Sequence, residues 1–295
     1  MRILSLIRKV INSLVTKYLI MNNLIKFISV GLLFLCGNLH AQNFQGVATY
    51  RSKTKFEVSV DSTSMNSPMQ KQIEEMLKNQ MNKTFKLTFD QVESIYEEEE
   101  SLAPPQPGAV MFAAVSFGSD NLYKNLKLNR YTRAEEFLGQ LFLVKDSIQK
   151  YDWQLTSETK QVGSYLCFKA TYDHEIDLSG FDAFIPDEDE VEQEPQFRTI
   201  TAWYTPQIPV SNGPGEFGGL PGLILELQDG NTNILCSQIV INPSERIAIK
   251  EPNKGKEVSQ SEFESIQHEK FKEMEENRGR PGKDGEHTIT IKIGN

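Results

Sequence analysis

A period-two alternation of side chains recurs along most of the chain and constrains the fold more than any other feature of the sequence. In one example, Phe56, Val58 and Val60 alternate with Glu57 and Ser59. Successive side chains of a strand point to opposite faces, so this period predicts strands with one buried face. The predicted strands are residues 47–52, 56–60, 84–89, 93–96, 123–126, 140–144, 165–172, 199–204, 223–227, 234–241 and 288–293. Short strands separated by turns are typical of an antiparallel sheet.

Two segments show the three-to-four spacing of a helix instead. The first opens at Ser67 and includes Met69 and Met76 in its apolar stripe. The second opens at Ser261, with Glu264 three residues later in the pattern of a capping box. Together these elements predict an α+β fold that is mainly β. We expect a curved antiparallel sheet with a C-terminal helix packed on it, and a short Met-containing helix near the N-terminus.

The charge is divided unevenly along the chain. Five of the 31 lysines and arginines lie in residues 1–41, which contain no Asp or Glu. Residues 42–295 carry the other 26 against 40 acidic residues, a net charge of −14. Nucleic-acid binding depends on clustered lysines and arginines. The acidic part of the chain is therefore not expected to bind nucleic acid.

The basic start has the form of a secretory signal. Lys26 precedes an apolar run over residues 27–35, and the small residue Ala41 ends the segment. Cleavage after Ala41 would separate an N-terminal extension and signal peptide, residues 1–41, from a single β-rich domain, residues 42–295. The apolar run is shorter than the roughly 20 residues that span a bilayer, so we expect the mature protein not to be transmembrane.

The expected location is the periplasm or the cell surface. Translation could start at Met1 or at Met21, which stands just before the signal-like segment. A lipoprotein anchored through Cys36 is an alternative. It is less favoured, because the bulky Leu35 stands where lipoprotein processing prefers a small residue.

The stretch from Ala202 to Leu227 contains the most informative motifs. It holds Ala-Trp-Tyr-Thr at residues 202–205 and Gly-Leu-Pro-Gly-Leu-Ile at residues 219–224. With these motifs the sequence resembles the GLPGLI family, secreted proteins of Bacteroidota. The resemblance extends over most of residues 44–293. It implies an exported β-rich protein and no particular reaction.

The hexapeptide at residues 219–224 has two interpretations. Pro221 and Gly222 suit the two central positions of a type II turn, which would lead rigidly into a core strand. On that strand, Leu223, Leu225 and Leu227 would face one side. Alternatively, residues 205–222 form a lip over a binding groove. The candidate binding residues are Trp203, Tyr204 and Phe217 as apolar contacts, Pro221 and Gly222 in the turn, and Glu226 as a polar contact.

Two cysteines, Cys167 and Cys236, remain if residues 1–41 are removed. An oxidising compartment permits a disulfide between them. Both also lie in apolar stretches, which is typical of buried free thiols. The sequence leaves these two alternatives open.

The sequence contains few patterns typical of metal binding or catalysis. Asp173, His174 and Glu175 are adjacent, but on a strand the alternation sends them to different faces. The chain has no Gly-x-Ser-x-Gly nucleophile motif and no His-Glu-x-x-His zinc motif. We therefore expect no metal and no cofactor, and the sequence favours a binding protein over an enzyme without deciding between them.

The leading hypothesis is an exported binding or envelope-interaction protein. Its sheet would shelter a hydrophobic ligand, or a hydrophobic segment of an envelope protein, against one face. One alternative is an envelope hydrolase that uses carboxylates such as Glu226 or Asp173. Another is a structural surface protein.

Overall fold

The computed structural model describes residues 44–55, 57–60, 82–99, 121–175, 197–278 and 289–292, together with the isolated residues 14, 17, 18 and 21. The chain divides into two compact units, Met1–Phe44 and Gln45–Asn295. All the strands and the long helix named below belong to the second unit. Among the described residues, none of the helices has the length and apolar character needed to cross a membrane.

The second unit is built mainly from strands. Its elements are β1 (Gln45–Thr54), β2 (Glu57–Val60), β3 (Thr84–Asp90), β4 (Glu93–Glu98), β5 (Asn121–Asn125), β6 (Arg130–Phe137), β7 (Gln140–Ser147), β8 (Gln154–Val162), β9 (Tyr165–Glu175), β10 (Phe197–Thr205), β11 (Leu223–Asp229), β12 (Thr232–Ile241), β13 (Lys256–Val258), α4 (Gln260–Arg278) and β14 (Ile289–Lys292).

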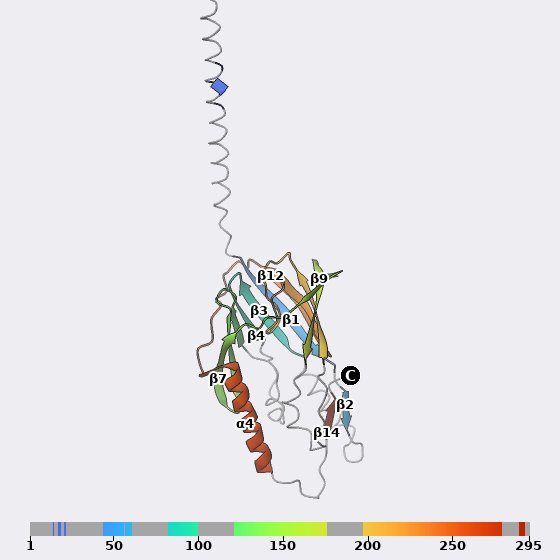
Figure 1. Ribbon diagram of the computed structural model, residues 1–295, viewed down its shortest axis with the longest axis vertical. Coiled ribbons are helices and arrows are strands. Elements are labelled where there is room, and N and C mark those ends of the chain that lie inside the picture. The colour runs from blue at the N-terminus through green and yellow to red at the C-terminus, as the bar shows by residue number, and fades with distance from the viewer. Residues whose placement is uncertain are drawn as a thin grey trace, which may run out of the picture. The chain divides into compact units, whose positions relative to one another are not determined.

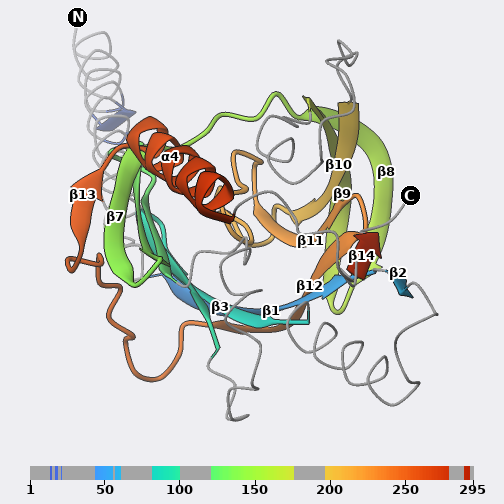
Figure 2. The same cartoon turned by 90° about the horizontal axis from the view of Figure 1, so that it is seen from below.

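Twelve of these strands form one curved sheet in the order β13-β7-β6-β5-β4-β3-β1-β12-β11-β10-β9-β8 (Figures 1 and 2). β13 pairs with β7 in parallel, and the other neighbours in this sheet are antiparallel. β14 and β2 form a separate antiparallel pair. Figure 2 shows α4 on the concave side of the large sheet, next to β7.

The expected α+β fold is corrected by this architecture. The described part of the second unit consists of a twelve-stranded sheet, a two-stranded sheet and one helix, α4. The described residues of this unit therefore form a mainly β fold with a single helix. The short Met-containing helix expected from Ser67 onward is not among the described elements, because residues 61–81 lie outside the described residues.

The strands predicted at residues 84–89 and 93–96 are confirmed as β3 and β4, which form an antiparallel hairpin whose register pairs Phe89 with Ser94. Three strands, β6, β8 and β13, were not predicted from the sequence. β6 carries charged residues on both of its faces, which hides the alternation of apolar and polar residues. β8 is an edge strand and most of its residues are exposed, so few apolar side chains mark it.

The expected C-terminal helix is confirmed, but its cap lies two residues earlier than Ser261 and Glu264. Ser259 Oγ accepts a hydrogen bond from the Glu262 amide at 3.3 Å, and Glu262 Oε2 accepts one from the Ser259 amide at 2.8 Å. This reciprocal pair is a capping box. The helix packs on the sheet through Phe263, which is buried with its ring 5.2 Å from that of Phe142.

Candidate functional site

Residues 206–222, here named the crossing segment, connect the neighbouring strands β10 and β11 but reach far across the sheet. Asn212 Nδ2 donates a hydrogen bond of 2.7 Å to Ser94 Oγ on β4. Lys124 Nζ on β5 donates to the carbonyls of Gly215, at 2.9 Å, and Phe217, at 3.2 Å. In the sheet order, β3, β1 and β12 separate β4 from β11. The crossing segment therefore links two distant parts of the concave face.

An aromatic cluster lies where the crossing segment meets β8 and β9. Its members are Tyr151, Trp153, Tyr172 and Phe217. The Tyr151 ring stacks on Phe217 at 5.2 Å between centroids and meets the Tyr172 ring edge-on at 5.3 Å. Trp153 lies 5.9 Å from Tyr172, and its indole Nε1 donates to the Gly218 carbonyl at 2.8 Å.

All four members of the aromatic cluster are half-buried. Trp153, Tyr172 and Phe217 pack against a fully buried apolar group. That group consists of Ala170, Ile200, Ala202, Tyr204, Leu220, Ile224 and Leu227. The cluster therefore has one side on the core and one side that retains access to solvent.

The hexapeptide turn differs from the expected type II turn. The Gly222 amide donates to the Leu220 carbonyl at 2.8 Å, which closes a three-residue γ-turn centred on the exposed Pro221. The Leu223 amide donates to the Ile208 carbonyl at 3.0 Å, not to Leu220. A type II turn is therefore wrong for this site, and the entrance to β11 is held by a bond within the crossing segment.

Residue 222 must be a glycine because its backbone passes very close to the chain at the end of β10. Its φ is 157°, and a Cβ added there would lie 2.2 Å from the Thr205 carbonyl oxygen. No side chain fits at that distance without moving the backbone. The contact fixes the point at which the crossing segment rejoins the sheet.

A β-bulge changes which side chains of β11 share a face. Trp203 pairs with Glu226, whereas the next residue, Tyr204, pairs with Ile224, so Leu225 is the extra residue. Ile224 and Leu227 consequently belong to the same buried group, although strict alternation from Leu223 would place them on opposite faces. The expected alternation of β11 is therefore wrong across the bulge.

Trp203 and Glu226 lie on the other face of the sheet from Tyr204. Lys160 Nζ lies 2.8 Å from Glu226 Oε2 and 4.2 Å from the centroid of the Trp203 ring. This arrangement combines an ion pair with a cation–π contact. The six candidate binding residues are therefore divided: Tyr204 and Phe217 face the concave side, Trp203 and Glu226 the convex side, and Pro221 and Gly222 form the turn.

Lys124 is a site residue that the sequence did not single out. It is buried, and desolvation lowers the pKa of its ammonium to about 7, with the opposing effect of nearby Glu216 smaller. Glu216 pairs with Arg133 on β6 at 2.5 Å, and Arg133 also donates to Gln260 on α4 at 2.7 Å. A single lysine in a strand is usually solvent-exposed, so no sequence pattern marks its role.

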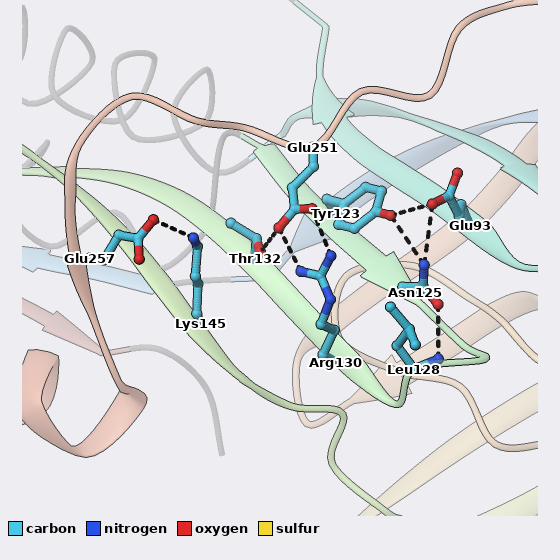
Figure 3. Close-up of polar contacts among 9 residues, drawn as sticks. All are labelled: Glu93, Tyr123, Asn125, Leu128, Arg130, Thr132, Lys145, Glu251 and Glu257. Carbon is cyan, nitrogen blue, oxygen red and sulfur yellow. Dashed lines mark hydrogen bonds and ion pairs between the residues drawn. The ribbon is translucent and has the colours of Figure 1, made fainter.

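The convex face of β4 to β6 carries a separate polar network, drawn in Figure 3. Glu251 accepts two hydrogen bonds from the Arg130 guanidinium, at 2.6 and 2.8 Å, and one from Thr132 at 2.7 Å. The bonds from Arg130 are the main reason why the pKa of Glu251 falls to about 2. Beside it, Tyr123 donates to Glu93 at 2.5 Å. This network fastens the segment between β12 and β13 to the sheet.

Cys167 and Cys236 are both free thiols in the structure. β10 and β11 separate their strands, β9 and β12, so their backbones are about 14 Å apart along the sheet. A disulfide needs Cα atoms within about 7 Å. Burial raises the pKa of the Cys167 thiol to about 11 and that of the Cys236 thiol to about 12.

The residues considered for metal or acid chemistry are dispersed. Asp173 accepts a hydrogen bond from Thr199 at 2.7 Å, and the His174 ring lies 6.1 Å from that of Tyr172. Within the part of the chain that the structure describes, no three His, Cys, Asp or Glu side chains gather as a metal site would require.

Two solved structures of PNGF-II, in space groups C2 and P21, are similar to this chain at 14% and 15% sequence identity, each with a TM-score of 0.44. The alignments cover 76% and 75% of this chain and 33% and 32% of those chains, so the chain spans about a third of their length. No curated protein matches. Residues 153–226, which run from Trp153 in the aromatic cluster to Glu226 on β11, match the family described as "Protein of unknown function (Porph_ging)".

Proposed function

We propose that this protein is an exported, non-enzymatic binding protein that shelters a hydrophobic ligand, or a hydrophobic segment of an envelope partner, against the concave face of its sheet. One observation carries the proposal. Tyr151, Trp153, Tyr172 and Phe217 form a contiguous aromatic cluster that is only half-buried. Large aromatic side chains with remaining access to solvent are typical of hydrophobic binding surfaces.

The fluorescence of Trp153 provides the test. The chain contains two tryptophans, so Trp203→Phe leaves Trp153, inside the aromatic cluster, as the one reporter. Palmitate titrated into this variant should give a saturable blue shift, because an apolar chain on the cluster removes water from the indole. Phe217→Ala in the same background should weaken binding about tenfold, since it removes one wall of the cluster.

Phe197→Ala is the matched control. Phe197 is an aromatic residue of β10 that is 68% exposed, and it is not a member of the aromatic cluster. It should leave the affinity for palmitate within about twofold. The proposal is contradicted if palmitate gives no saturable response and native mass spectrometry of detergent-free protein detects no bound species.

Export is part of the same proposal. It is supported by the basic and apolar pattern of residues 1–41 and by the resemblance to the secreted GLPGLI family, which we infer to be the family matched at residues 153–226. The mass of the mature protein should correspond to a chain that starts at Gln42. A diacylglyceryl group on Cys36 would instead identify a lipoprotein.

The hydrolase alternative gains no support from its candidate carboxylates. Glu226 is paired with Lys160 on the convex face, and Asp173 accepts a hydrogen bond from Thr199. Neither is in the aromatic cluster. A binding role therefore accounts for more of the site than acid–base chemistry does.

A further inference from the structure

We propose that Lys124 is the positioning residue that holds Phe217 in the aromatic cluster. A residue of β5 would then fix the arrangement of the binding face beside β8 and β9. The inference rests on the proposed function, because it assigns a control point to that same site. It starts from the contacts of the crossing segment. The Phe217 ring stacks on Tyr151, while the Phe217 carbonyl accepts a hydrogen bond from Lys124.

The tether at this point has several parts. Lys124 binds the carbonyls of Gly215 and Phe217, on either side of Glu216. The Glu216 carboxylate is itself paired with Arg133. Three consecutive residues of the segment, Gly215, Glu216 and Phe217, are thus bound to β5 and β6 at the point where the Phe217 ring enters the aromatic cluster.

A buried ammonium makes this tether sensitive to pH. Burial disfavours the charged form of Lys124 and lowers its pKa to about 7, whereas an open segment would let water solvate the ammonium. Protonation therefore favours opening, and the closed segment gains stability as pH rises above 7. The groups that face Lys124 are Glu216 from the segment, Ser94 from β4, and Tyr131 and Arg133 from β6.

Hydrogen–deuterium exchange of residues 206–224, without any ligand, is the direct measurement. In the wild type, the opening constant, corrected for intrinsic exchange, should fall about tenfold for each pH unit between pH 7 and 9. Lys124→Met keeps the length of the side chain and removes its charge and its two hydrogen bonds. Its opening constant should be independent of pH and, at pH 9, larger than that of the wild type. His174→Gln, near the cluster but not in the tether, should behave as the wild type does.

Glu216→Gln provides a second variant that keeps Lys124. Loss of the neighbouring negative charge should lower the pKa of Lys124 further, so the pH at which the opening constant begins to fall should move below 7. If Lys124→Met fails to fold, this displacement still decides the question. A wild-type profile that is flat between pH 7 and 9, or a Glu216→Gln profile that begins to fall at the same pH as the wild type, overturns the proposal.

Binding separates this inference from the proposed function. In the Trp203→Phe background, Lys124→Met should weaken palmitate binding about tenfold, because Phe217 loses its fixed position. If palmitate never binds but the exchange profile follows Lys124, the positioning role stands and the proposed ligand class fails. If palmitate binds equally well to wild type and Lys124→Met, and exchange is flat, the binding function stands and the positioning role fails.

Discussion

At the scale of single residues, backbone geometry decides more than side-chain chemistry at the hexapeptide. Pro221 is exposed at the centre of a γ-turn, whereas Gly222 touches the carbonyl of Thr205 so closely that a Cβ would lie 2.2 Å from its oxygen. These two neighbours are both typical turn residues in sequence. In the structure they have different tolerance to substitution.

Alanine substitutions should separate the two residues. Gly222→Ala should lower the free energy of unfolding by about 3 kcal/mol or more, because the backbone must move to admit the methyl group. Pro221→Ala should cost at most about 1 kcal/mol, since the ring is exposed. Urea denaturation followed by circular dichroism measures both values.

Gly163→Ala is a suitable control for the conformational part of the effect. Gly163 has a φ of 58° and no heavy atom within 4 Å of an added Cβ. It should cost about 1 kcal/mol, from backbone strain alone. A Gly222→Ala variant no less stable than Gly163→Ala would contradict the role given to the close approach.

At the scale of elements, an irregular segment is held to a regular one by charged contacts. The segment between β12 and β13 has little regular structure, yet Glu251 fastens it to Arg130 and Thr132 of β6 (Figure 3). The sequence offers no local sign of this pairing, because Glu251 lies 121 positions after Arg130 and 119 positions after Thr132. The register of β6 in the sheet brings them together.

The Glu251 contacts should make the free energy of unfolding depend on pH in the acid range. Its pKa is about 2 in the folded chain against 4.5 for the free group, so its contribution is present above pH 4.5 and is lost as pH falls toward 2. After allowance for partial exposure, Glu251→Gln should cost about 1–2 kcal/mol at pH 7 and much less at pH 3. Thermal unfolding at the two pH values measures the difference.

Glu257→Gln is the matched control for this prediction. Glu257 also forms an ion pair, in its case with Lys145, but its side chain is 65% exposed. An exposed pair should contribute about 0.5 kcal/mol or less. Equal losses for the Glu251 and Glu257 variants at pH 7 would show that burial does not distinguish the two pairs.

At the scale of the whole molecule, strand order determines which residues can meet. Cys167 and Cys236 both lie in strands that the sequence predicts, and an oxidising compartment would permit a bond between them. β10 and β11 stand between those strands. These two intervening strands keep the cysteines apart. The long crossing segment has the opposite effect, because it brings residues that precede β11 into contact with the distant strands β4 and β5.

Thiol counting should confirm that the two cysteines remain free. Both have raised pKa values, about 11 and about 12, so native protein should react slowly with a disulfide reagent at pH 8. Denatured, unreduced protein should show two thiols per chain once residues 1–41 have been removed. Adding a reductant before denaturation should not change the count. A count that rises by two on reduction would require a Cys167–Cys236 bond.

The elements were largely predictable because their signals are local. The period of two marks β1, β3, β9 and β12, and the helical spacing marks α4, since each pattern depends on neighbours in sequence. β6 and β8 were not predictable for a related reason. The charged side chains of β6 bind partners on other elements, so they interrupt its apolar pattern. β8 lies at the exposed edge of the sheet and buries few side chains.

By itself, the sequence determined that the chain forms many antiparallel strands and a C-terminal helix, and it marked the hexapeptide as a turn into a buried strand. Only the tertiary structure decided which residues share a site. A bulge at Leu225 placed Ile224 and Leu227 in one core, and the crossing segment brought Phe217 to Lys124. The physical reason is that local periodicity assigns side chains to faces, whereas bulges, strand order and the path of long connections set distances between residues far apart in the chain.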